Sequence, residues 1–199
     1  MRIRQISFCA IFTALTAAGA FIKIPIPGNS LMFTLQTFFV FMAGLMLEVK
    51  YAFLSQLAYM AIGLIGFPVF SQGGGIAYVL NPSFGFIIGF CACATAVSLL
   101  VRKNLISLIS DKSKKLSSLF KVITGALISI VILYFFGVTY MYFIYNLYLV
   151  KPVQFGDLIV SAAGIFIFLD MIKFALVIPL CIAMYKRLPG KWLVSSPQN

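Results

Sequence analysis

The sequence predicts an all-α integral membrane protein, a bundle of six transmembrane helices with both termini in the cytoplasm. Of the 199 residues, 62% are hydrophobic and 10% are charged, and the mean hydropathy is +1.09. A soluble domain has about a quarter of its residues charged, so this composition excludes one. The hydrophobic residues form six long runs, and Lys and Arg collect in the segments between alternate runs. We expect the whole chain, residues 1–199, to form one membrane domain.

The first three hydrophobic runs cover residues 6–22, 32–47 and 51–67. Arg2 and Arg4 precede the first run, and Lys23 with a Pro-rich stretch follows it in place of a small-residue cleavage site. We therefore interpret this run as a retained helix and not as a signal peptide. A tight charged turn at 48–50 follows the second run. Pro68 and the glycines after it end the third.

The other three runs cover residues 84–101, 122–150 and 158–185. We expect the fourth to stop abruptly at Arg102. Residues 102–121 are rich in Lys and Ser with interleaved Leu and Ile, which predicts a loop with an interfacial amphipathic turn. The fifth run is longer than an untilted span requires, and its Tyr residues gather towards the far end, as is typical of a membrane interface. Residues 151–157 form the next loop.

The basic residues predict the orientation of the bundle. Only Lys23 and Lys151 fall on one side of the predicted bundle, whereas the opposite side receives Arg2, Arg4, Lys50, Arg102, Lys103, Lys112, Lys114, Lys115, Lys121, Lys186, Arg187 and Lys191. Cytoplasmic segments are enriched in Lys and Arg, so the more basic side is cytoplasmic. We expect a multi-pass protein of the cell (inner) membrane whose loops 23–31, 68–83 and 151–157 gather at the outer mouth.

Several classes of function are excluded by composition. The chain has no His and only 4 acidic residues, which excludes His-dependent catalysis and leaves little to hold a metal ion. The net charge of +11 does not predict nucleic-acid binding, because the basic residues lie between apolar runs and do not line one soluble face. All 4 Cys residues lie inside apolar runs and are interpreted as small buried side chains.

Asp170 and Lys173 interrupt the sixth apolar run. Inserting one charged side chain at the bilayer centre costs about 2.5 to 3.5 kcal/mol on insertion scales. Two such side chains in one helix therefore indicate either a stabilising partner or a functional role. Their i,i+3 spacing puts them on one helical face, where they can pair with each other and with a ligand in the bundle interior. The alternative is an internal ion pair that only fixes the orientation of the helix.

The segment before the fourth run combines a glycine triplet, which includes Gly74, with Tyr78, Asn81 and Pro82. Glycines allow the backbone to fold closely over a cavity, and Tyr78 and Asn81 offer an aromatic wall and a bidentate amide. The segment is either a lid or a surface turn in which Asn81 caps the next helix. The two interpretations are compatible.

Ala10, Ala14 and Ala18 form a stripe of small side chains along the first run. Such a stripe allows another helix to approach closely in the membrane. From the spacing alone, packing against a neighbouring helix of the same bundle is the favoured interpretation.

Three stretches carry a family resemblance: TLQTFFVFMAGL at 34–45, LIGFPVFSQGGG at 64–75 and NPSFGFIIGF at 81–90. They resemble the BioY family, the biotin-binding S components of energy-coupling factor (ECF) transporters. The resemblance covers nearly the whole chain in order, including the Asp170–Lys173 pair, and is least distinctive between 105 and 155. One departure is Phe84, which stands where the family often has glycine and narrows the entrance beside the loop.

The resemblance implies a biotin-binding subunit with no cofactor and no catalytic residues. On this resemblance, we expect a pocket that faces outward near the outer ends of helices four to six, under the loop between helices three and four. The resemblance also implies that the alanine stripe docks on a transmembrane coupling protein, which two ATPase subunits drive. It further implies that the subunit reorients in the membrane to deliver biotin inward.

Biotin has a ureido ring with two N–H donors and one carbonyl, an apolar thiophane ring and an anionic valerate chain. We expect Asp170 and Asn81 to bind the ureido group. Lys173 either donates to the ureido carbonyl or pairs with the valerate. We expect aromatic side chains to surround the biotin rings, namely Phe67, Phe70, Tyr78 and Phe84. Gln36 is a weaker candidate for a polar contact with biotin, and Gly74 belongs to the loop over the pocket.

Two alternatives remain open at this point. The first is an S component for another vitamin, thiamin or a flavin, although a single acid beside a lysine is a poor site for cationic thiamin. The second is an integral membrane enzyme or a scaffold that uses Asp170 and Lys173 as an acid–base pair. No nucleophile, His or metal-ligand set accompanies that pair in the sequence.

Overall fold

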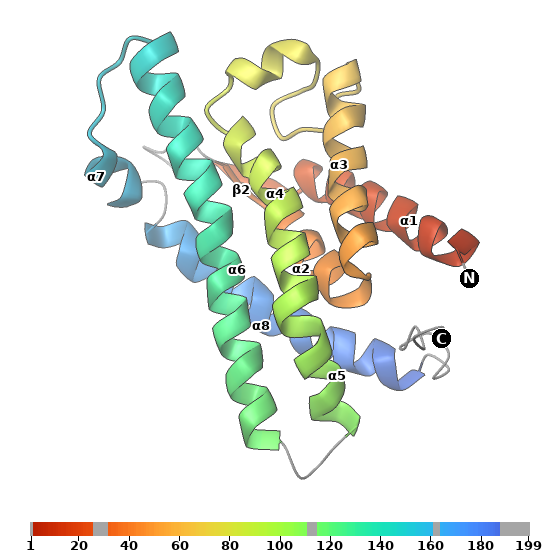
Figure 1. The fold of residues 1–199 in the computed structure, drawn as a ribbon. Coiled ribbons are helices and arrows are strands. Elements are labelled where there is room, and N and C mark those ends of the chain that lie inside the picture. The colour runs from red at the N-terminus through yellow and green to blue at the C-terminus, as the bar shows by residue number, and fades with distance from the viewer. Residues whose placement is uncertain (1, 26–31, 111–114, 161–163, 188–199) are drawn as a thin grey trace.

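A computed structural model describes residues 2–25, 32–110, 115–160 and 164–187. The chain is mostly helical (Figure 1). Its main helices are α1 (Arg2–Phe21), α2 (Gln36–Met46), α3 (Val49–Ile65), α4 (Phe84–Val97), α5 (Lys103–Ser110), α6 (Lys115–Phe143), α7 (Phe155–Leu158) and α8 (Gly164–Arg187). The shorter turns are the 3₁₀ helix η1 (Ile76–Leu80) and the π-helical turns η2 (Ser98–Arg102) and η3 (Ile144–Tyr148).

The helices have the length and composition of membrane spans. Four continuous helical segments in the described part of the chain are long and apolar enough to cross a bilayer: 3–21, 84–109, 116–148 and 166–187. Helices α2 and α3 are apolar but shorter, with 11 and 17 residues. The protein is therefore an integral membrane protein that crosses the bilayer several times, and the count of six spans stays a prediction.

The all-α prediction misses a small antiparallel sheet. Strands β1 (Lys23–Pro25) and β2 (Met32–Thr34) pair with Lys23 opposite Thr34. The second predicted helix accordingly begins at Gln36 rather than at Met32. Three-residue strands are too short to show an alternating pattern, and Pro25 stands at the end of its strand, where the missing N–H costs no ladder bond.

The prediction that the fourth helix stops at Arg102 is wrong. Helix α4 continues through the π-helical turn η2 into α5, which ends at Ser110. A long basic side chain can extend its charge towards water while its stem stays in the bundle, so Arg102 does not end the helix. Much of the predicted loop is helical, and residues 111–114 of it lie outside the described ranges.

The last two apolar runs also have different limits from those expected. Helix α6 begins at Lys115 rather than at Val122. Helix α7 lies mostly in the predicted loop 151–157, whose last three residues are therefore helical, and α8 begins at Gly164, with residues 161–163 outside the described ranges. Asp170 and Lys173 therefore lie in the first half of α8, about two turns from its start.

Helices α4 and α6 lie side by side along much of their length (Figure 1). Three glycines allow the close approach, because a Cβ atom would collide with Tyr140 at Gly85 and with Phe86 at Gly137, and would press tightly against Leu133 at Gly89. Helix α2 is central: four of its side chains are fully buried, and it contacts α1, α4 and α8. The start of α2, the middle of α6 and α8 meet at one place, where they frame a cavity.

Candidate functional site

An open cavity of about 610 Å³ lies between the β2–α2 junction, the α3–α4 loop, and helices α4, α6 and α8. Its polar lining residues are Thr34, Gln36, Thr37, Ser71, Gln72, Tyr78, Ser83, Tyr134, Asp170 and Lys173. Its apolar lining residues are Met32, Phe86, Ile87, Phe90 and Phe166. An apolar middle with polar groups at both ends suits an elongated, amphipathic ligand.

One end of the cavity holds a buried ion pair. Lys173 Nζ lies 2.7 Å from Asp170 Oδ1, and the two residues are 6% and 4% exposed. The i,i+3 spacing on α8 brings the two side chains together, as predicted from the sequence. Because the charges are opposite and in contact, this end of the cavity is neutral overall.

The ammonium group of Lys173 has no N–H left for a ligand. It donates to Thr34 O at 2.8 Å, to Thr37 Oγ1 at 2.7 Å and to Asp170 Oδ1 at 2.7 Å. It also lies 4.1 Å from the centre of the Phe33 ring, a favourable contact for a cation. An ammonium group has three N–H donors, so these three acceptors use all of them.

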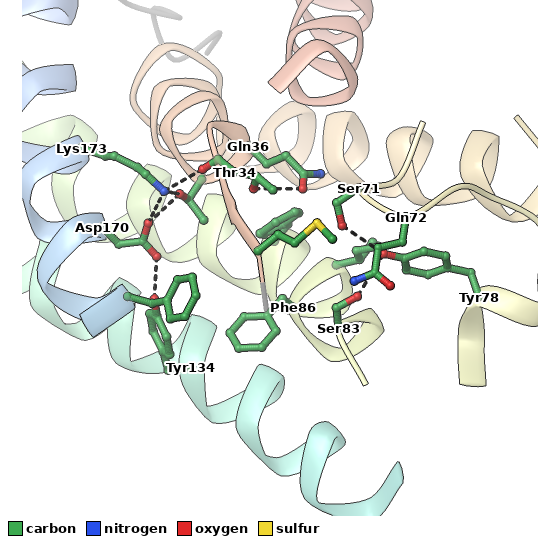
Figure 2. A pocket seen from close by; sticks show the side chains of 15 residues that line it. Thr34, Gln36, Ser71, Gln72, Tyr78, Ser83, Phe86, Tyr134, Asp170 and Lys173 are labelled. Carbon is green, nitrogen blue, oxygen red and sulfur yellow. Dashed lines mark hydrogen bonds and ion pairs between the residues drawn. The ribbon is translucent and has the colours of Figure 1, made fainter. Parts of the chain in front are cut away.

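The carboxylate of Asp170, in contrast, keeps one acceptor position open. Oδ1 accepts from Thr37 Oγ1 at 2.7 Å as well as from Lys173. Oδ2 accepts from Tyr134 OH at 2.8 Å. A carboxylate oxygen can accept two hydrogen bonds, so Oδ2 has room for one donor from a ligand in the cavity. Figure 2 shows Tyr134 and Lys173 on either side of Asp170, each joined to it by a dashed line.

The other end of the cavity is formed by the α3–α4 loop and carries no charge on the described lining residues. Tyr78 OH lies 3.2 Å from Ser71 Oγ and 3.0 Å from Ser83 Oγ. Gln72 is exposed, and its Oε1 accepts from Asn81 Nδ2 at 3.0 Å. In Figure 2 these groups lie across the cavity from Asp170.

Four predicted site residues line the cavity: Asp170, Lys173, Gln36 and Tyr78. Gln36 is 5% exposed, and its Nε2 donates one hydrogen bond to Tyr59 OH, while its Oε1 accepts from Thr34 Oγ1 at 3.2 Å. The second N–H of the Gln36 amide has no acceptor among the described residues. It is therefore available to a ligand carbonyl.

The other predicted contacts lie in or beside the α3–α4 loop and do not line the cavity. Asn81 is used within the loop, since its Oδ1 accepts from the backbone N–H of Ser83 at 2.9 Å and from Ser83 Oγ at 2.7 Å. Its contact with a ureido group stays a prediction. Phe70 and Phe84 are buried behind the cavity, whereas Phe67 is 60% exposed.

Gly74 allows the α3–α4 loop to fold back on itself. A Cβ atom at this position would collide with the carbonyl oxygen of Phe67. Behind the loop, the ring of Phe70 packs 4.6 Å from that of Tyr78, measured between ring centres. These contacts hold Tyr78 at the edge of the cavity, so Gly74 and Phe70 support the site from behind.

Sequence reasoning missed Thr37 and Tyr134, the two hydroxyl groups that bind Asp170. Thr37 adjoins Gln36, which was predicted, and the start of an apolar helix is a suitable place for a polar contact. Tyr134 lies in the middle of the long apolar run of α6 rather than in its Tyr-rich far end, and that isolated hydroxyl was the available signal. Which face of α6 meets α8 depends on packing, which the sequence pattern does not reveal.

The described residues hold no group of three or more His, Cys, Asp or Glu side chains that could bind a metal ion. The ion pair, the amide and the hydroxyl groups are hydrogen-bonding groups suited to a neutral polar ligand. The site is thus equipped for binding.

The family model of the BioY family matches residues 1–190. The chain belongs to the BioY family. This confirms the resemblance carried by residues 34–45, 64–75 and 81–90.

Individual relatives agree with the BioY match. The chain is 46% identical over 140 residues to the "Probable biotin transporter BioY" of Lysinibacillus sphaericus, covering 70% of this chain and 65% of that protein. It is 39% identical over 102 residues to the "Biotin transporter BioY" of Thermotoga maritima, covering 51% of this chain and 59% of that protein. These matches thus span somewhat less than two thirds of the relatives. A "Probable biotin transporter BioY" of Bacillus subtilis is 32% identical over 171 residues, with 79% and 84% covered.

A solved structure has the same fold as this BioY family member. It is the S-component for biotin from an ECF-type ABC transporter, and it superposes with a TM-score of 0.75 at 25% identity over 96% of each chain. The likeness extends over the whole bundle, so the helices that frame the cavity have counterparts in a membrane protein of known architecture.

Proposed function

We propose that this protein is the biotin-binding S component of an ECF-type vitamin uptake transporter. One observation carries the proposal: a member of the BioY family has a cavity with a buried, neutralised ion pair that leaves Asp170 Oδ2 open to one donor. Biotin is the cargo, and we assign no cofactor. The transporter names of the relatives also argue against a membrane enzyme or scaffold that uses the pair for acid–base chemistry.

The hydrogen-bond pattern favours the ureido ring, rather than the valerate, at the ion-pair end. A carboxylate is best matched by free N–H donors with an uncompensated positive charge, whereas all three N–H groups of Lys173 are used and its charge is balanced by Asp170. A ureido N–H instead matches the open position on Asp170 Oδ2. The remaining N–H of the Gln36 amide matches the ureido carbonyl.

The rest of the ligand then extends through the apolar middle towards the α3–α4 loop. Phe86, Ile87 and Phe90 of α4 provide the surface for the thiophane ring and the aliphatic chain. Tyr78, Ser71 and Ser83 receive the far end of the chain. This orientation assigns Asp170, Gln36 and Tyr78 to ligand contact and Lys173 to neutralising Asp170. Gly74 and Phe70 support the loop, and the predicted contact of Asn81 with the ureido group is not used in this orientation.

We further propose six membrane spans within one domain, with α2 and α3 as short spans inside the bundle. The termini then lie in the cytoplasm and the cavity opens outward. The distribution of Lys and Arg supports this topology, since Lys23 and Lys151 are the basic residues on the cavity side of the predicted bundle. Delivery of biotin requires that the whole subunit reorients in the membrane.

The alanine stripe of α1 is a suitable surface for the transmembrane coupling protein, which two ATPase subunits drive. Ala10, Ala14 and Ala18 are exposed. The opposite face of α1 is held to α3, where Thr13 Oγ1 donates to Ser55 O at 2.8 Å. Packing against a helix of the same bundle therefore does not use the stripe, which leaves a smooth lipid-facing surface for a partner helix.

Replacing Ala14 with Leu tests the docking surface. We expect Ala14→Leu to keep biotin affinity unchanged and to lower uptake by cells that contain the coupling module by about tenfold, because the larger side chain separates the two helices. Radiolabelled biotin uptake and titration of the purified protein measure the two effects. Ile11→Leu, on the same exposed surface but without a gain in volume, is the control. Normal uptake by Ala14→Leu would exclude this face as the docking surface.

The decisive test of the function is isothermal titration of the purified, ligand-free protein with biotin, thiamin and riboflavin. Saturable binding of biotin alone, near one ligand per protein, is the expected result. Binding of thiamin or riboflavin instead would keep the architecture and replace the ligand. Absence of binding in folded protein would overturn the proposal.

A further inference from the structure

The orientation proposed above leaves the valerate carboxylate of biotin at the loop end of the cavity, where the described lining residues are neutral. Lys173 is the one basic residue among the cavity-lining residues, and it lies at the opposite end. The segments 26–31 and 161–163, which lie outside the described ranges, contain no Lys or Arg in the sequence. A positively charged partner for an anion at the loop end must therefore come from beyond the lining residues.

Lys23 supplies a positive charge at this position. It lies in β1 directly opposite Thr34 of β2, and directly opposite residues in an antiparallel pair have their side chains on the same face of the sheet. Thr34 lines the cavity, so the Lys23 side chain starts from the cavity face of the hairpin. Its Nζ reaches the α3–α4 loop and donates to Ser71 O at 2.7 Å. Ser71 itself lines the cavity.

The charge of Lys23 is not neutralised by this contact. Ser71 O is a carbonyl oxygen, which accepts one hydrogen bond and carries no net charge. The ammonium group has two further N–H donors, and no ion pair with an acidic residue is seen in the described ranges. Lys23 is also exposed, so it can meet a group that emerges from the cavity.

We propose that Lys23 is the binding partner of the ligand's carboxylate and thereby distinguishes the free acid from its uncharged amides and esters. This inference rests on the proposed binding of biotin with its ureido ring at Asp170. The contact is exposed to water, so its effect is moderate and decreases with salt. We expect the loss of Lys23 to weaken biotin binding by about two- to fivefold at low ionic strength.

The test compares the binding of two ligands, one with and one without the carboxylate, to proteins with and without Lys23. Wild-type protein and Lys23→Gln are titrated with biotin and with biotinamide, in which a neutral carboxamide replaces the carboxylate. Lys151→Gln is the matched control, because it removes the other basic residue of the same predicted side and does not line the cavity. Lys23→Arg keeps the charge and is expected to keep the preference for biotin.

The expected result is that Lys23→Gln weakens biotin but leaves biotinamide unchanged within about twofold, and that about 0.5 M salt removes the difference. Equal weakening of both ligands would mean that Lys23 only holds the hairpin to the loop, and would overturn the inference. An equal effect of Lys151→Gln would assign the result to general electrostatic attraction and would also overturn it. Failure of wild-type protein to bind biotin would instead refute the proposed function.

Discussion

The two ends of the cavity are built in different ways. The ion-pair end takes its groups from α2, α6 and α8, and Asp170, Lys173, Thr37 and Tyr134 are all at most 8% exposed. The loop end takes its groups from the α3–α4 loop, where Gln72 is exposed and the other polar lining residues are only partly buried apart from Tyr78. One end is buried and shielded from water, and the other borders water.

This difference determines how much each hydrogen bond contributes. A polar group that loses its partner in a buried site cannot turn to water, so the cost is about 1–3 kcal/mol and more for a charged group. At an exposed rim, water replaces the lost partner and the cost is small. The ion-pair end should therefore set the affinity for the ligand, whereas the loop end should adjust it.

Asp170→Asn is the substitution with the largest expected effect. It removes the charge-assisted acceptor for the ligand and leaves the buried ammonium of Lys173 without its counter-charge. We expect biotin binding to weaken by about 1 to 3 kcal/mol, measured by isothermal titration. Size-exclusion chromatography and a thermal melt in detergent check that the variant is folded. Wild-type affinity in folded protein would remove Asp170 from the site.

More of the fold than of the site could be predicted from the sequence. Six apolar runs and the basic segments between them indicated a helical membrane bundle, since both features depend on composition and length alone. The β1–β2 hairpin could not be predicted because each strand has only three residues. The continuation past Arg102 was missed because a charged residue at a helix end and one inside a helix look alike in sequence.

Within the site, contacts between residues close in the sequence could be predicted, whereas contacts between distant residues could not. Asp170 and Lys173 are three residues apart on one helix, so their contact follows from helical geometry. The contact of Tyr134 with Asp170 joins α6 to α8 across 36 positions of the chain. It depends on the rotation of α6, which the close packing of its Gly137 against Phe86 of α4 helps to set.

Lys173→Met should change which ligand charge the ion-pair end prefers. Without the ammonium group, the Asp170 carboxylate faces the cavity uncompensated and favours a cation. Iminobiotin, whose cyclic guanidinium replaces the ureido group, provides that cation. We expect the ratio of iminobiotin to biotin affinity to rise at least about tenfold, or about 1.4 kcal/mol, relative to wild type.

The ratio of the two ligands separates this effect from a general loss of binding. A variant that is merely damaged should lose both ligands in proportion. An unchanged ratio in folded Lys173→Met would mean that the ureido ring does not lie at the ion pair, and would reverse the proposed orientation of biotin.

Tyr134→Phe should have a smaller effect, since it removes one of the three donors to Asp170 and retains the ring and its packing against Phe86. We expect biotin binding to weaken by about 1 kcal/mol, because the carboxylate is held less firmly. Tyr140→Phe is the matched control on the same helix: its hydroxyl donates to Val79 O and does not line the cavity. Equal losses in the two variants would contradict a specific role of Tyr134.

Gln72→Ala should have the smallest effect of these substitutions. The side chain is exposed, and its hydrogen bond to Asn81 lies at the rim, where water can replace either partner. We expect a change in biotin affinity of at most about 0.5 kcal/mol, measured by titration under the same conditions as Asp170→Asn. A loss as large as that of Asp170→Asn would show that the loop closes over the ligand and buries Gln72. In that case the two ends of the cavity would be equally shielded from water once biotin is bound, and the affinity would depend on both ends alike.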